Sequence, residues 1–100
     1  MKLGRVIGTA VATVKSRGLE SYKLLLVRDF QEDDGETPDA ASGYYVAIDT
    51  VGAGVGEIVL VAFGSAARLF SGPLDAPVDA AIIAILDTVR IGDRSVFERR

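Results

Sequence analysis

The chain has 100 residues with 14 acidic and 11 basic side chains, hence a formal net charge of −3, and this length fits one domain with one core. It contains neither histidine nor cysteine, which excludes a Ser-His-Asp triad, a cysteine nucleophile, a Cys/His zinc site and a disulfide. The negative charge also argues against the basic surface on which most nucleic-acid-binding proteins depend.

The apolar content of the chain is high for a small domain. Hydrophobic residues make up 49% of it, with 11 glycines besides, and a small domain buries a smaller share of its surface than a large one. The excess apolar surface therefore predicts contact with further copies of the chain or with a partner. No run of about 18 apolar residues is present, so we expect a cytoplasmic protein without membrane contact.

Valine and isoleucine are abundant, and because β-branched side chains favour pleated strands, the composition predicts an all-β fold. The first predicted strand, Leu3–Val14, has Gly4 and Gly8 on one face. Glycine at alternate strand positions indicates a tight bend or the close approach of another backbone, as in a small coiled barrel.

Three further apolar runs lack the alternation of a half-exposed strand, which implies cover on both faces. In a small barrel, one cover is the core and the other must be a neighbour. These predicted strands are Lys23–Arg28, Tyr44–Asp49 and Glu57–Phe63.

The last apolar run, Val78–Ile91, fits two structures. Val78, Ile82 and Ile85 lie at helical spacing, continued by Leu86 and Val89, and Pro77 precedes them as a helix start would require. Many of the residues are β-branched, however, which favours a strand. We interpret the run as a short helical turn followed by a strand.

The connections are easier to recognise. Asp29–Asp39 holds six of the 14 acids together with Gly35 and Pro38, so a solvated loop is expected. Its acids do not follow the spacing of an EF-hand, which argues against a calcium site. Residues 15–21 are expected to form a turn, and residues 64–69 a short helix.

The segment Gly52-Ala53-Gly54-Val55-Gly56 resembles a dinucleotide-binding glycine loop only superficially. That mechanism needs a helix N-terminus at the pyrophosphate, whereas a predicted strand follows here. We therefore expect a turn between strands and no cofactor. Glycines in such a turn let two backbones pack closely at a symmetry axis, since they carry no side chain.

Ser65 and Arg68 lie in the segment GSAAR, which lacks the G-x-S-x-G pattern of a nucleophile elbow. Arg68 is expected to pair with a carboxylate such as Asp79 or Asp87, within the chain or across a subunit contact. With no histidine base and no tryptophan for a carbohydrate cleft, an enzyme is not expected, and neither is a metal site.

Four ordered blocks carry a resemblance to a known family. They are MKLGRVIGTAVATVK at the start, KLLLV, VAIDTVGAGVGEIVLVAFGSAAR and PVDAAIIAILDTV. Together they cover nearly the whole chain and resemble the bacterial microcompartment vertex proteins, the pentamer-forming family of EutN and CcmL. The most specific motifs are D-x-V-G-A-G-x-G-E at Asp49–Glu57, G-S-x-A-R at Gly64–Arg68 and P-V-D-A-A-I-I at Pro77–Ile83.

The resemblance implies a five-stranded barrel related to the OB fold, with one or two short helices, assembled as a cyclic homopentamer that caps the five-fold vertices of a protein shell. Hexameric shell proteins would then be its partners at the rim. It also implies subunit contacts, and the residues expected there are Gly52, Gly54, Gly56, Ser65, Arg68 and Asp79.

Two segments depart from the matching blocks, residues 30–42 and the tail 92–100, so the expected division is a barrel domain at 1–91 and a tail at 92–100. One of these segments is expected to meet the hexameric neighbours. The alternative function is an OB-like module for single-stranded nucleic acid, which needs a basic groove with stacking aromatics. A carboxylate or lysine enzyme would need a deep polar pocket.

Overall fold

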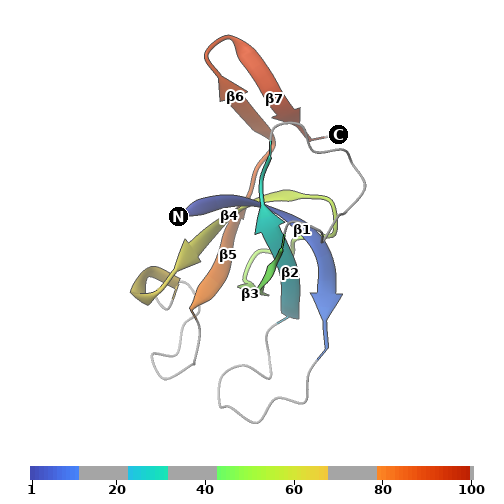
Figure 1. Cartoon of the computed structure of the whole chain (residues 1–100), viewed down its shortest axis with the longest axis vertical. Helices are drawn as coiled ribbons and strands as arrows, with labels where there is room; N and C mark the ends of the chain where they lie inside the picture. The colour runs from blue at the N-terminus through green and yellow to red at the C-terminus, as the bar shows by residue number, and fades with distance from the viewer. Residues whose placement is uncertain (12–22, 32–42, 68–78, 100) are drawn as a thin grey trace.

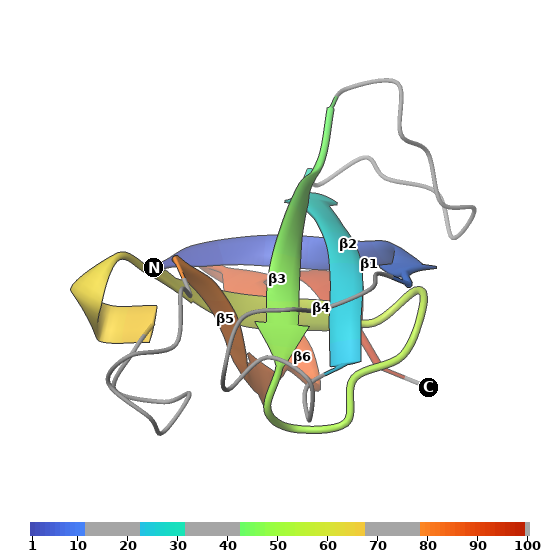
Figure 2. The same cartoon turned by 90° about the horizontal axis from the view of Figure 1, so that it is seen from below.

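The computed structural model describes residues 1–11, 23–31, 43–67 and 79–99, and seven strands lie within these ranges. Five of them close into a barrel in the order β1-β2-β3-β5-β4 (Figure 2). β6 and β7 form a separate two-stranded sheet that stands away from the barrel (Figure 1). Within the described ranges, no helix has the length and apolarity to span a bilayer. The strands are β1 (Lys2–Ala10), β2 (Lys23–Asp29), β3 (Tyr45–Asp49), β4 (Ile58–Phe63), β5 (Ala80–Ile85), β6 (Thr88–Ile91) and β7 (Arg94–Glu98).

Each strand of the closed barrel pairs with two others, and the two pairings of β1 overlap along the strand. Its first half, from Lys2 to Arg5, is antiparallel to β4, and the stretch from Gly4 to Ala10 is antiparallel to β2. A register shift between Val6 and Gly8 bends the strand. β3 and β5 are parallel and complete the circle. The five-stranded barrel expected from the sequence is confirmed.

The core fills the inside of the barrel. Because side chains alternate along a strand, one face of each barrel strand supplies the core. Ala53, which precedes β4 in the connection from β3, is also buried in this cluster. The fully buried large side chains of the cluster are Val6, Leu25, Val27, Val59, Val61 and Ile82.

A second apolar cluster combines Ile48 of β3 and Ala81 of β5 with Ala67. Residues 65–67 are helical, which agrees with the short helix expected at 64–69. The sequence predicted that a neighbour covers the outer face of the barrel strands. At β3 and β5, residues 65–67 of the same chain supply part of that cover. Apolar side chains at neighbouring positions, such as Ile58 and Val59, are both fully buried, as expected for strands covered on two faces.

Of the interpretation of Val78–Ile91 as a short helical turn followed by a strand, the strand is confirmed, whereas residues 79–91, the part that the structure describes, contain no helical turn. Residues 80–85 and 88–91 are strands, interrupted at 86–87. Ile82 and Ile85 are opposite Val61 and Val59, and a register shift lies between them. The extra residue of this bulge turns both isoleucines toward the core. Two core side chains of one strand are therefore three residues apart in the sequence, a spacing that is typical of a helix.

The C-terminal segment is more regular than a tail. β6 and β7 are antiparallel, and Gly92, with a φ of 60°, lies in the turn between them. The expected division after residue 91 falls at this turn. Several expectations lie outside the described residues: the end of the first predicted strand at 12–14, the turn at 15–21, most of the acidic loop, Arg68 and Val78.

Gly4→Ala should destabilise the barrel, because a Cβ at this position would lie 2.5 Å from Cγ1 of Val27 and 3.1 Å from the carbonyl oxygen of Arg28. We expect a loss of about 1–3 kcal/mol in the free energy of unfolding, measured by chemical denaturation. Thr9→Ala at an exposed position of the same strand is the control and should change stability by less than about 0.5 kcal/mol. Equal effects of the two substitutions would contradict the close packing at Gly4.

Candidate subunit interface

The loop between β3 and β4 closes one end of the barrel. Oδ1 of Asp49 accepts hydrogen bonds from the backbone N–H groups of Val51 (3.1 Å) and Gly52 (3.0 Å), the arrangement by which an aspartate stabilises a turn. Gly52 and Gly56 have φ angles of 83° and 92°, which side chains with a Cβ rarely adopt. The loop therefore bends back and inserts Ala53 into the core.

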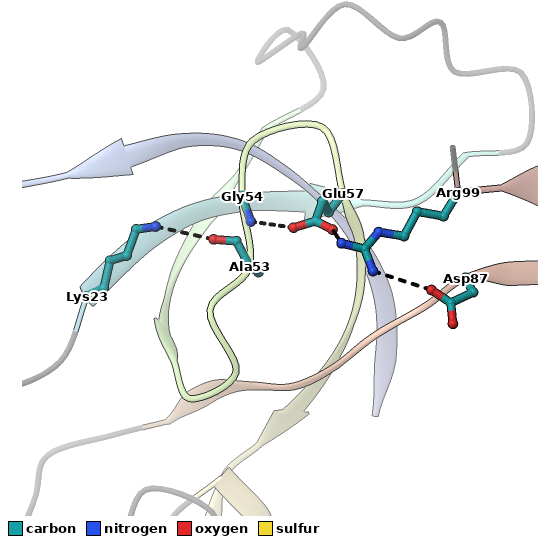
Figure 3. A network of polar contacts seen from close by, with 6 residues as sticks. All are labelled: Lys23, Ala53, Gly54, Glu57, Asp87 and Arg99. Atoms are coloured by element: carbon teal, nitrogen blue, oxygen red, sulfur yellow. Dashed lines mark hydrogen bonds and ion pairs between the residues drawn. The ribbon is translucent and has the colours of Figure 1, made fainter.

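A polar network connects this loop to Lys23 at the start of β2 and to Arg99 after β7 (Figure 3). Glu57 Oε1 accepts a hydrogen bond of 2.7 Å from the Gly54 N–H, and Lys23 Nζ donates one of 3.2 Å to the Ala53 carbonyl. Glu57 Oε2 forms an ion pair of 2.7 Å with Nη2 of Arg99, next to β7. Nη1 of Arg99 lies 3.4 Å from Oδ1 of Asp87. One carboxylate thus connects the loop to the C-terminal hairpin.

The loop also presents apolar side chains to solvent. Val51 and Val55 are 39% and 53% exposed, although the backbone that carries them is fixed by Asp49 and Glu57. A rigid, exposed apolar surface is typical of a protein contact. Sequence reasoning selected the glycines of this loop and missed these valines, whose alternation with glycine was the available signal.

The remaining predicted contact residues lie at the other end of β4. Ser65 follows this strand and Asp79 precedes β5, and both are exposed. The Gly64 N–H donates a 3.0 Å hydrogen bond to the Asp79 carbonyl, which brings the two segments together. The glycine loop is separated from them by the six residues of β4, about 20 Å of strand. The predicted contact residues described by the structure therefore form two separate surfaces.

A pocket of about 250 Å³ lies beside the start of β1 and is lined mainly by polar groups. Lys2 Nζ is 3.7 Å from Asp29 Oδ2 there. Burial, and secondarily the charge of Asp29, raises the pKa of Tyr45 to about 12. An activated nucleophile needs a lowered pKa, so this phenol is not activated. The lining residues are Lys2, Arg28, Asp29, Gln31, Gly43, Tyr44 and Tyr45.

In the part of the chain that the structure describes, the aromatic side chains do not form a platform for bases. Tyr45 packs on Phe63 with ring centroids 5.3 Å apart, and the guanidinium of Arg5 lies 5.9 Å from the Phe97 ring. Among the aromatic residues of the described ranges, only Tyr44 is largely exposed. One exposed ring falls short of the successive stacking sites that single-stranded nucleic acid requires.

Tyr45 should lose its phenolic proton at a higher pH than an exposed tyrosine does. Its neutral form is favoured in the folded state, so its contribution to stability is complete below pH 10, the ordinary tyrosine value, and is lost as the pH rises through about 12. An ultraviolet titration of tyrosinate should show one delayed phase that Tyr45→Phe removes. A delayed phase that persists in this variant would refute the assignment.

Glu57→Ala should weaken the whole connection between loop and hairpin. It removes the acceptor of the Gly54 N–H and the partner of Arg99, and we expect a loss of about 1–3 kcal/mol in the free energy of unfolding. Asp87→Asn is the matched control: its side chain is 80% exposed, so the loss should stay below about 0.5 kcal/mol. Denaturation of both variants at one protein concentration tests this, and equal losses would assign Glu57 no special role.

Comparison with known proteins agrees with this geometry. The EutN_CcmL family model, described as ethanolamine utilisation protein EutN/carboxysome, matches residues 1–87. The chain is 45% identical over 100 residues to the carboxysome shell vertex protein CcmL of Synechococcus elongatus, covering 100% of this chain and 97% of the relative. It is 53% identical over 91 residues to the microcompartment shell vertex protein PduN of Salmonella typhimurium, covering 89% and 98%.

A solved structure extends the comparison to the fold. The GrpN pentameric microcompartment shell protein of Rhodospirillum rubrum superposes with a TM-score of 0.74 at 46% identity, covering 92% of this chain and 100% of that protein. The family model spans the entire barrel and ends just before β6. The chain therefore belongs to the EutN/CcmL family of bacterial microcompartment shell vertex proteins.

Proposed function

We propose that five copies of this chain form a closed ring that caps a five-fold vertex of a microcompartment shell in the cytoplasm, and that the rim of the ring contacts hexameric shell proteins. The role is structural and not catalytic. The similarity to a pentameric shell protein over the whole barrel carries the proposal.

Shell geometry supplies the physical reason for such a ring. Hexagonal subunits alone tile a flat sheet or roll into a tube, so a closed shell needs five-fold units. A cyclic ring uses heterologous contacts, in which each subunit contributes two different surfaces. We assign these two surfaces to the loop around Gly52, Gly54 and Gly56 and to the surface with Ser65 and Asp79, which lie at opposite ends of β4.

The glycine loop supports a tight subunit contact. Val55 is half exposed between Gly54 and Gly56, so a neighbouring backbone could approach this surface closely. Arg68 belongs to the same proposal as a polar contact residue. The contact with hexameric proteins is proposed for residues 30–42 or for the C-terminal hairpin, since a vertex must be bound by a different protein at its rim.

Native mass spectrometry tests the ring directly and should show five copies of the chain. Val55→Asp should lower the pentamer population at least tenfold, because a carboxylate at the proposed contact would lose its hydration. Val55→Thr, which keeps the shape of the side chain, should retain most of the pentamer. A monomeric wild-type chain at working concentration would refute the ring, and an unaffected Val55→Asp pentamer would exclude this loop from the contact.

A further inference from the structure

The pocket beside the start of β1 contains none of the residues assigned to the two subunit surfaces. Its volume of about 250 Å³ is several times the roughly 30 Å³ that one water molecule occupies in the liquid, so a molecule of several non-hydrogen atoms fits. Two cations, one carboxylate and two phenols line it, and no other charged side chain does so among the described residues. Several polar groups that converge on one pocket are typical of a ligand site.

The charges of the pocket favour an anion. Lys2 and Arg28 are its cations and Asp29 is its carboxylate, so the lining has a formal charge of +1, whereas the whole chain has −3. Arg28 is only 4% exposed, and a charge attracts an ion more strongly where less water surrounds it. The Lys2 Nζ and Asp29 Oδ2 atoms are 3.7 Å apart, and both side chains are more than half exposed. Their pairing therefore leaves both groups accessible to a ligand.

The Tyr45 hydroxyl is a second, independent indication of a ligand. Its oxygen is buried, and within the described residues no group forms a hydrogen bond with it. A buried hydroxyl without a partner is destabilising, and such a group in a native protein calls for a partner from outside the chain. The charge of Asp29 acts on this phenol, so the hydroxyl lies near the charged groups of the pocket. Because burial raises its pKa to about 12, it keeps its proton at neutral pH and is a donor for an anion.

Asp29 restricts which anion is suitable. An ionised carboxylate only accepts hydrogen bonds, so it repels an anion without protons and binds one that offers a hydroxyl group. We propose that this pocket binds a small oxyanion that also carries a hydroxyl, such as hydrogen phosphate or a hydroxycarboxylate. Lys2 and Arg28 bind the charged oxygens. Tyr45 donates a hydrogen bond to one of these oxygens, and Asp29 accepts one from the ligand hydroxyl.

Tyrosine fluorescence tests binding directly, because the chain has no tryptophan and two of its three tyrosines line the pocket. The wild-type chain is titrated with inorganic phosphate and, separately, with lactate, at neutral pH and at an ionic strength held constant with chloride. At least one anion should change the fluorescence saturably, with a dissociation constant of about 1 mM. The anion that does so identifies the ligand as a phosphate or a hydroxy acid. No saturable change with either anion would overturn the proposal.

Sulfate and propionate test the need for a hydroxyl, because they lack the one that hydrogen phosphate and lactate carry. Each should bind the wild-type chain at least about threefold more weakly than its counterpart. In Asp29→Asn, whose side chain at this position is 60% exposed in the wild type, the amide can donate a hydrogen bond. Binding of the anion without a hydroxyl should therefore rise about threefold in this variant. Equal binding of both anions of a pair to the wild-type chain, or an unchanged ratio in Asp29→Asn, would contradict the role of Asp29.

Lys2→Gln and Tyr45→Phe should each weaken binding at least about threefold, because they remove a charge and a hydrogen-bond donor from the pocket. Arg90→Gln is the matched control: it removes the charge of an exposed arginine in β6 and should leave binding unchanged. Equal losses in the control and in Lys2→Gln would assign the effect to overall charge and overturn the pocket. Native mass spectrometry separates this proposal from the ring, since five copies without anion binding would refute the pocket alone.

Discussion

The structure depends on closure of the barrel, in which each of the five strands pairs with two others; β1 pairs with β4 from Lys2 to Arg5 and with β2 from Gly4 to Ala10. A barrel of five strands must curve sharply to close. Gly4 permits close packing of β1 on β2 because a Cβ there would collide with Val27, and the register shift after Val6 bends the strand. Without this closure, two sheet edges would be exposed and the core would open.

Closure leaves the ends of a small barrel to be covered. At one end the loop after β3 does so by burying Ala53 in the core. The hydrogen bonds that hold this loop come from Asp49 and Glu57, and Glu57 also pairs with Arg99. Core packing, loop conformation and hairpin direction are therefore physically connected through one carboxylate.

The apolar side chains of the described ranges are partly buried within the chain and partly exposed on its surface. One face of each barrel strand fills the core, and part of the outer face is covered by the helical residues 65–67. Within the described ranges, the large hydrophobic side chains that remain exposed are Met1, Val11, Tyr44, Val46, Val51, Val55 and Ile91. A family whose members form shell vertices provides partners for such surfaces, which explains how a chain with 49% hydrophobic residues remains a small barrel.

The sequence by itself determined the strand-forming runs, the helical residues after β4, the lack of histidine and cysteine chemistry, and the family. These follow from local periodicity, composition and motif order. Only the tertiary structure decided that Ile82 and Ile85 share a face across a bulge, that residues 94–98 pair with 88–91, and that Arg99 reaches Glu57. Such features depend on the register between strands distant in sequence, and register is set by packing of the whole barrel, which no local pattern records.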